Sequence, residues 1–299
     1  MDNLWIAAAL IAAAAQTGRN ATQASLTKAI GTVGATQVRF LFGLPFAVIF
    51  LGLIVLVTGD GIPAIPLRAL AFTAMGAGAQ IGATALMLLL MKSRSFAVTT
   101  AWIKTEPVMV ALMAALVLHD PLTVPMIVAI AIATAGVLLM SVKPEVGRAM
   151  WREGIPALTG LLAGLLFGIS AIGFRGGITS LPTGDFLIRA TTTLVLGLIL
   201  QSATLALWLA IFNRKALTAS FQVWRPSLGA GFLGAFASQF WFIGFSLTSA
   251  ANIRTLALVE VIFAAGVSRY ILRQPISQRQ VIGMAIIVAG IALLLRSQP

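Results

Sequence analysis

A lysine, a glutamate and a proline fall within four consecutive positions of an apolar run. Residues 102–108 read WIKTEPV, inside a run that covers residues 96–118. A charge at the centre of a bilayer costs at least about 2.5 kcal/mol on insertion scales, so it is normally paired or faces a water-filled cavity. Glu106 has the chemistry to bind a proton or a cationic group, and Lys104 has the chemistry to bind an anionic group.

A second glutamate lies at a matching depth. Glu106 and Glu260 each lie about eleven residues into an apolar run, which at about 1.5 Å per residue is about 16 Å, close to the bilayer midplane. Lys104 is two residues from Glu106 and faces another side of the helix, so each charge needs a partner on a different helix. Two hypotheses stay open for the glutamates: each ties neighbouring helices together, or one binds a proton or a cationic group of the substrate.

Other polar and aromatic side chains in the apolar runs extend the candidate site. Trp102 lies one turn before Glu106 on the same helix face, although core or interface packing explains a single tryptophan better. Pro107 removes a helix hydrogen bond and disfavours helical geometry before it, so we expect a kink or hinge there. The predicted substrate-binding residues are Gln16, Arg19, Asn20, Gln80, Trp102, Lys104, Glu106, Gln239, Trp241, Arg254 and Glu260. Arg39, Arg175 and Arg189 are predicted to form structural charge pairs.

The elements that hold these side chains are predicted to be membrane helices. Of the 299 residues, 59% are hydrophobic and 9% are charged, which is far too little charge for a soluble domain. The apolar residues fall in continuous runs of about 20, the length of a helix that crosses a bilayer. The fold class is therefore predicted to be all-α integral membrane. The ten predicted spans are 4–25, 35–57, 67–91, 95–117, 123–141, 155–175, 186–212, 226–246, 249–271 and 277–295.

Several other functions have no support in the sequence. The formal charge of +12 is spread over the gaps between apolar runs, so we expect no nucleic acid partner. The chain has no cysteine and one histidine, His119, so we expect no metal site, and no cofactor motif appears. His119-Asp120 is too small a cluster for catalysis, and we expect no enzyme. The first run lacks a basic amino-terminal region, so we expect a retained helix.

The two halves of the chain resemble each other. Residues 104–123 align without gaps on residues 258–277, which sets Glu106 on Glu260 and Pro121 on Pro275. Further matches set Gly136 on Gly290 and Arg39 on Arg189. Five helices per half require the two copies to lie inverted in the membrane, an architecture typical of secondary transporters. We predict a first repeat over 1–143, a linker over 144–154 and a second repeat over 155–299.

These residues resemble the drug/metabolite transporter superfamily in its ten-helix form with two EamA repeats. The resemblance depends on the second-helix arginines, the two glutamates, the turns HDPLT and RQPIS, and the closing glycines. It departs from the family where the turn usually carries Gly-Glu-Arg, and where Val261 stands in the place that matches Pro107.

The resemblance implies a secondary transporter that exports a small organic metabolite, such as an amino acid, by alternating access with proton coupling or exchange. It implies a monomer or homodimer in a prokaryotic inner membrane. The excess of basic over acidic residues within the predicted spans favours an anionic or zwitterionic substrate. The alternatives are an integral-membrane enzyme and a channel-like protein without coupled transport.

The basic residues also predict an orientation. Twelve lysines and arginines, including Arg214, Lys215 and Arg225, fall in gaps on one side of the ten predicted spans. Arg68, Arg175 and Arg296 fall on the other side, which also holds both termini. Because cytoplasmic loops carry the excess of basic residues, this count predicts both termini outside. The family resemblance implies cytoplasmic termini instead, and we favour the charge count.

Overall fold

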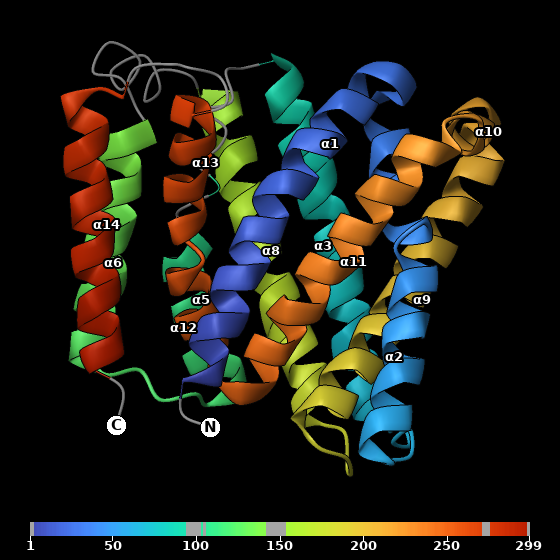
Figure 1. The fold of residues 1–299 in the computed structure, drawn as a ribbon, viewed down its shortest axis with the longest axis horizontal. Helices are drawn as coiled ribbons and strands as arrows, with labels where there is room; N and C mark the ends of the chain where they lie inside the picture. Colours follow the sequence, from blue (N-terminus) through green and yellow to red (C-terminus); the bar gives the residue numbers. More distant parts are fainter. Residues whose placement is uncertain (1–2, 94–102, 104–105, 142–153, 271–275, 298–299) are drawn as a thin grey trace. The chain divides into compact units, whose positions relative to one another are not determined.

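The computed structural model describes residues 3–93, 103, 106–141, 154–270 and 276–297. Within these ranges the regular structure is helical and no strand occurs, which confirms the all-helical class (Figure 1). The elements are α1 Leu4–Leu41, α2 Leu44–Thr58, α3 Leu67–Ser93, α5 Glu106–Met113, the π-helix η1 Ala114–Leu118, α6 Val124–Ser141, α8 Gly154–Thr179, α9 Phe186–Phe212, α10 Arg214–Gln222, α11 Trp224–Leu247, α12 Ala250–Leu256, α13 Val259–Tyr270 and α14 Gln278–Arg296.

Many of these helices suit a membrane by length and composition. Two shorter apolar helices, Glu106–Leu118 and Val124–Met140, accompany the longer ones. The stretches of the described chain that are long and apolar enough to cross a bilayer are Ile30–Thr58, Leu67–Leu90, Leu158–Thr179, Phe186–Phe212, Trp224–Leu247 and Gln278–Arg296. The arrangement of ten spans as inverted repeats stays a prediction.

The observed helices match the predicted spans at some ends and differ from them at others. The predicted span 186–212 coincides with α9, because the Asp185 carboxylate accepts the backbone N–H of Ile188 at 2.9 Å and fixes the first turn. By contrast, the predicted gap between the first two spans is helical and belongs to α1. Within α1, Gly31 has φ 75° and ψ 174°, a conformation that glycine adopts without strain and that kinks the helix.

Two further differences from the predicted spans concern the second half of the chain. Residues 213–225 were expected to connect two spans, but they contain α10, whose first turn is capped by the Asn213 side chain. The predicted span 249–271 is interrupted at residues 257–258, which separates α12 from α13. Apolar residues fill that interruption, so neither proline nor glycine marks it in the sequence.

The helices form two compact units. Unit 1 contains residues Met1–Ile81 and Ser170–Thr248, and unit 2 contains Gly82–Ile169 and Ser249–Pro299. Each unit therefore takes helices from both sequence halves. This division differs from the predicted repeats, which stay a prediction.

In unit 1, α1 lies along α11, and α9 contacts both (Figure 1). A Cβ atom added to Gly231 would lie 2.5 Å from the carbonyl carbon of Phe42, so only glycine allows this approach of α11 to the end of α1. Leu26 and Val38 of α1 pack in one hydrophobic cluster with Ala230 of α11. The cluster and the close approach together hold these two helices.

In unit 2, α6 and α14 lie side by side (Figure 1). A Cβ atom at Gly136 would lie 2.8 Å from the Gly283 carbonyl oxygen, and one at Gly290 would lie 2.6 Å from the Ala133 nitrogen. The glycines that the sequence alignment matched therefore line the same contact. Beside this pair, α5 packs against α12 and α6.

Candidate functional site

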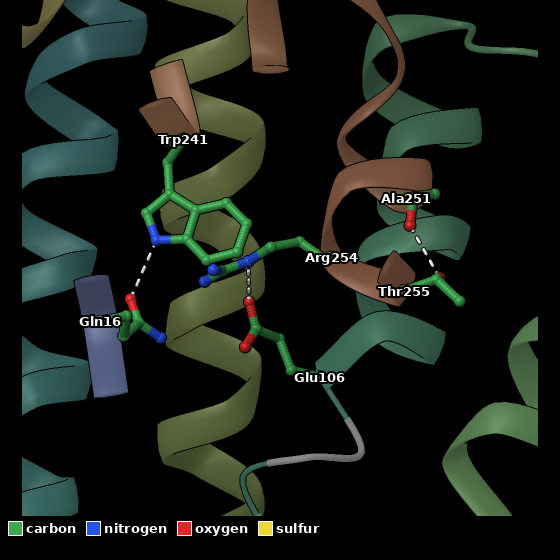
Figure 2. Close-up of polar contacts among 6 residues, drawn as sticks. All are labelled: Gln16, Glu106, Trp241, Ala251, Arg254 and Thr255. Atoms are coloured by element: carbon green, nitrogen blue, oxygen red, sulfur yellow. Dashed lines mark hydrogen bonds and ion pairs between the residues drawn. The ribbon is translucent and has the colours of Figure 1, made fainter. Parts of the chain in front are cut away.

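A buried ion pair joins two helices of unit 2. The Arg254 Nε atom on α12 donates to the Glu106 Oε1 atom on α5 at 2.6 Å, and Figure 2 shows the two groups facing each other. The side chains are 13% and 10% exposed, so both charges are largely removed from solvent. Charge-assisted hydrogen bonds of this length are strong. The sequence required a partner for Glu106 on another helix, and the structure supplies Arg254.

The interruption between α12 and α13 explains how this segment accommodates charge. Arg254 lies in the last turn of α12 and buried Glu260 lies in the first turn of α13. A cation is favoured at a helix carboxyl end and an anion at an amino end, so each residue matches the dipole of its own helix. Backbone bonds from Leu258 to Thr255 and from Glu260 to Ala257 close the intervening turn.

Pro107 is buried directly after Glu106 in α5, and α5 continues into the π-helix η1. A π-helical turn changes the helix geometry and is frequent at functional sites. Residues 104–105 lie outside the described residues, so the predicted kink at Pro107 stays a prediction. Trp102 and Lys104, both predicted to bind substrate, also lie outside the described residues.

In unit 1, a tryptophan and a glutamine join α11 to α1. The Trp241 indole Nε1–H donates to the Gln16 Oε1 atom at 2.9 Å, as Figure 2 shows for this pair. Trp241 is buried and Gln16 is half-buried. The structure thus brings together two residues that the sequence predicted separately for the site.

Two buried arginines converge on one glycine of α11. A Cβ atom added to Gly234 would lie 3.5 Å from Cγ of Arg39 and 3.8 Å from Cδ of Arg19, so both side chains pass over this residue. The Arg19 Nη2 atom donates to Asn20 Oδ1 at 3.0 Å, and the Arg39 guanidinium lies 5.1 Å from the centre of the Phe40 ring. Unit 1 thus gathers positive charge at α1 and α11.

Two of the predicted site amides, Gln80 and Gln239, bond to residues that the sequence reasoning missed. The Gln201 Nε2 atom donates to Gln80 Oε1 at 2.8 Å, which links α9 to α3. The Gln239 Nε2 atom donates to Thr191 Oγ1 at 2.7 Å, which links α11 to α9. Polar side chains inside apolar spans were the available signal, and Gln201 and Thr191 carried it as clearly as their partners.

Arg175 and Arg189, the other two arginines predicted to form charge pairs, bond to backbone carbonyls. Arg175 donates through Nη1 to the carbonyl oxygens of Phe245, at 2.7 Å, and Thr248, which close the carboxyl end of α11. Arg189 donates to the carbonyl oxygens of Ile178 and Thr179, both at 3.2 Å, at the end of α8. These contacts satisfy orphan helix carbonyls, a structural use of arginine. The contacts described for Arg189 are with carbonyls rather than with a carboxylate.

Gln37 is a polar residue that the sequence reasoning overlooked. Its side chain is fully buried in α1, and neither amide atom has a hydrogen-bonding partner among the described residues. An unsatisfied amide in an apolar interior costs free energy, so such a group is normally retained for a reason other than packing. Its position two residues before Arg39, inside an apolar span, was the signal available.

Known proteins resemble this chain in sequence over its second half and in fold over nearly its whole length. Residues 154–296 match the family model described as the EamA-like transporter family. One solved crystal structure has a TM-score of 0.70 at 15% sequence identity, over 97% of this chain and 96% of its own. At that identity the likeness concerns the fold alone, and it extends through the first half of the chain. A comparison with curated protein sequences gave no match.

Proposed function

This chain belongs to the EamA-like transporter family of the drug/metabolite transporter superfamily, and we propose that it moves a small polar metabolite across the membrane by alternating access. It is a multi-pass membrane protein, and we propose a prokaryotic inner membrane as its location. We further propose export, coupled to protons or to exchange, as the direction and energy source. The substrates that we favour are amino acids and related compounds.

The ion pair between Glu106 and Arg254 is the observation that carries this proposal. Removing two charges from water is expensive, and apolar residues of similar volume are often as stabilising as a buried pair. Charged residues inside membrane spans are therefore functional candidates by default. The pair also joins α5 to α12, next to the interrupted segment 257–258, and discontinuous helices form substrate sites in many transporters.

A zwitterionic substrate would exchange the pair for two new pairs. Its ammonium group would bind the Glu106 carboxylate and its carboxylate would bind the Arg254 guanidinium, so no buried charge would lose its counterion. A proton on Glu106 would instead weaken the pair and release Arg254. Either event alters a contact between two helices, which is the kind of local change that alternating access requires.

Transport by a carrier is tested by counterflow in proteoliposomes. We expect unlabelled substrate preloaded inside the vesicles to accelerate uptake of the labelled compound. A thermal-shift screen of metabolites against the purified protein selects the compounds, because a specific ligand raises the unfolding temperature by mass action. If no compound in a broad panel shows counterflow, the carrier proposal fails and the channel-like alternative gains.

We propose, from the charge count, that both termini face away from the cytoplasm. A reporter that is active only in the cytoplasm, fused to the carboxyl terminus, is expected to be inactive. The matched control carries the reporter next to Lys143, in the predicted gap between the fifth and sixth spans, and should be active. The reverse result would overturn this orientation while leaving the transport proposal intact.

A further inference from the structure

The short helix α10 combines a packed side with an exposed basic end. It contacts α1, α9 and α11 within unit 1. Its Ser220 is buried and accepts at its carbonyl oxygen from Ser227 Oγ at 3.4 Å, and the ring of Phe221 lies 5.7 Å from that of Phe42. These contacts hold α10 in place, while Arg214 and Lys215 in its first turn are exposed.

Exposed aromatic side chains flank α10 at both of its ends. Trp208 is 43% exposed and Phe212 is 70% exposed, with ring centres 5.5 Å apart. Beyond α10, Trp224 is 50% exposed, and the exposed Arg225 guanidinium lies 5.4 Å from its ring centre. Exposed aromatic rings mixed with basic side chains are typical of the interface between hydrocarbon and headgroups. We name this surface the basic aromatic patch: Trp208, Phe212, Arg214, Lys215, Phe221, Trp224 and Arg225.

The patch has no nearby carboxylate within the described part of unit 1. The sequence contains no acidic residue between Asp185 and Glu260. In the described part of unit 1, the carboxylates are Asp60 and Asp185, and Asp60 Oδ2 accepts the backbone N–H of Asp185 at 3.4 Å. Asp185 caps the start of α9, whereas Arg214 follows its end. The 27 residues of α9 separate them by about 40 Å.

We propose that the basic aromatic patch binds the headgroups of anionic phospholipids. Arg214, Lys215 and Arg225 supply the positive charge, and the four aromatic rings insert beside the acyl chains. In the orientation proposed above, with both termini away from the cytoplasm, the patch lies on the cytoplasmic side of the membrane. This inference needs the membrane location but is independent of the transported substrate.

The test measures binding of phosphatidylglycerol to detergent-purified full-length protein by native mass spectrometry. The variant K215Q/R225Q removes two exposed charges and keeps Arg214, whose Nε atom bonds to the Ala210 carbonyl oxygen at 2.8 Å. The matched control R68Q/R296Q removes two exposed charges elsewhere. We expect phosphatidylglycerol to bind K215Q/R225Q about tenfold or more weakly than wild type, with the control unchanged.

Three further measurements separate specific lipid binding from a change in fold or in side-chain shape. The charge-conserving variant K215R/R225K should bind phosphatidylglycerol like wild type. The affinity for neutral phosphatidylcholine should differ little between wild type and the variants. Unchanged unfolding temperatures of K215Q/R225Q would show that the fold is intact. The proposal is overturned if K215Q/R225Q binds phosphatidylglycerol like wild type, if R68Q/R296Q loses as much, or if inorganic phosphate displaces the lipid at equal concentration.

Discussion

Glu106 and Glu260 occupy matching positions of the two sequence halves, yet their surroundings differ. Glu106 accepts a hydrogen bond from Arg254 on another helix at 2.6 Å and is followed by Pro107. Glu260 lies in the first turn of α13, after an interruption, and is followed by Val261. Leu258 and Val261 pack in a hydrophobic cluster with residues of α6 and α14.

The difference indicates that a shared residue type need not have a shared role. The first glutamate is held by a guanidinium from the other half of the chain, which apolar packing does not require. The second glutamate lies between residues that pack in the core, at a helix start where the dipole favours an anion. We therefore expect Glu106 to contribute mainly to transport and Glu260 mainly to the scaffold.

The largest expected effect comes from removing Arg254. Arg254→Met takes the ion-pair partner from a buried carboxylate, so we expect the free energy of unfolding to fall by about 3–5 kcal/mol and transport to be lost. The double variant E106Q/R254M should recover most of the stability but no transport, which a double-mutant cycle in detergent would measure. Arg296→Met, at the exposed end of α14, is the control. A double variant as unstable as Arg254→Met would contradict the pair as described.

The next effect concerns proton coupling, which we expect to require Glu106 but not Glu260. In proteoliposomes, Glu106→Gln should abolish transport driven by a pH gradient and leave exchange partly active, because glutamine still accepts a hydrogen bond but cannot bind a proton. Glu260→Gln should retain transport driven by the gradient and lose about 0.5–1 kcal/mol of stability from the helix start. Asp120→Asn, beyond the end of η1, is the control. Equal loss of coupling in both glutamine variants would remove the distinction between the glutamates.

A smaller effect is expected from replacing Gln37, which tests whether this residue contributes to transport, as expected for Glu106, or to the scaffold, as expected for Glu260. Gln37→Met replaces an amide with no described hydrogen-bonding partner by an apolar group of similar length. We expect the unfolding free energy to stay level or rise by up to about 1 kcal/mol, while transport falls. Gln201→Met is the matched control: it removes a bond to Gln80 and should destabilise by about 1–2 kcal/mol. Wild-type transport by Gln37→Met would make the amide irrelevant to the site.

The smallest expected effect comes from replacing Pro107, which follows Glu106, by valine, the residue type that follows Glu260. Pro107→Val restores a backbone N–H in α5, so we expect substrate binding to persist and the exchange rate to fall if a kink at Pro107 contributes to transport. Binding is followed by thermal shift and exchange by counterflow. Val261→Ala, at the matching position, tests loss of packing without any change in backbone hydrogen bonding. An unchanged exchange rate in Pro107→Val would assign the proline to passive geometry.

Several features of the fold could be predicted because each has a local cause. The length of the apolar runs predicts membrane helices, and the predicted span 186–212 coincides with α9, whose first turn the Asp185 side chain caps. The interruption at residues 257–258 has no such local marker, and α10 is too polar to stand out from a loop. Prediction therefore succeeded for the long apolar spans and failed at residues 257–258 and at α10, whose Asn213 cap does not distinguish it from a loop.

The candidate site divides in the same way. The depth of Glu106 and Glu260 in their apolar runs identifies them as unusual, because a bilayer penalises a charge wherever the chain then goes. The choice of Arg254 as the partner of Glu106 required two segments about 150 residues apart to meet. The unsatisfied amide of Gln37 could be recognised only once its surroundings were known.

The sequence by itself determined that this chain is helical, belongs in a membrane and carries two carboxylates far inside apolar runs, because hydrophobic length and charge cost are properties of each segment alone. Only the tertiary structure decided which charges meet, which arginines close helix ends and which amide lacks a partner among the described residues. Those outcomes depend on which faces of distant helices pack together, and the energy of each contact exists only after that packing.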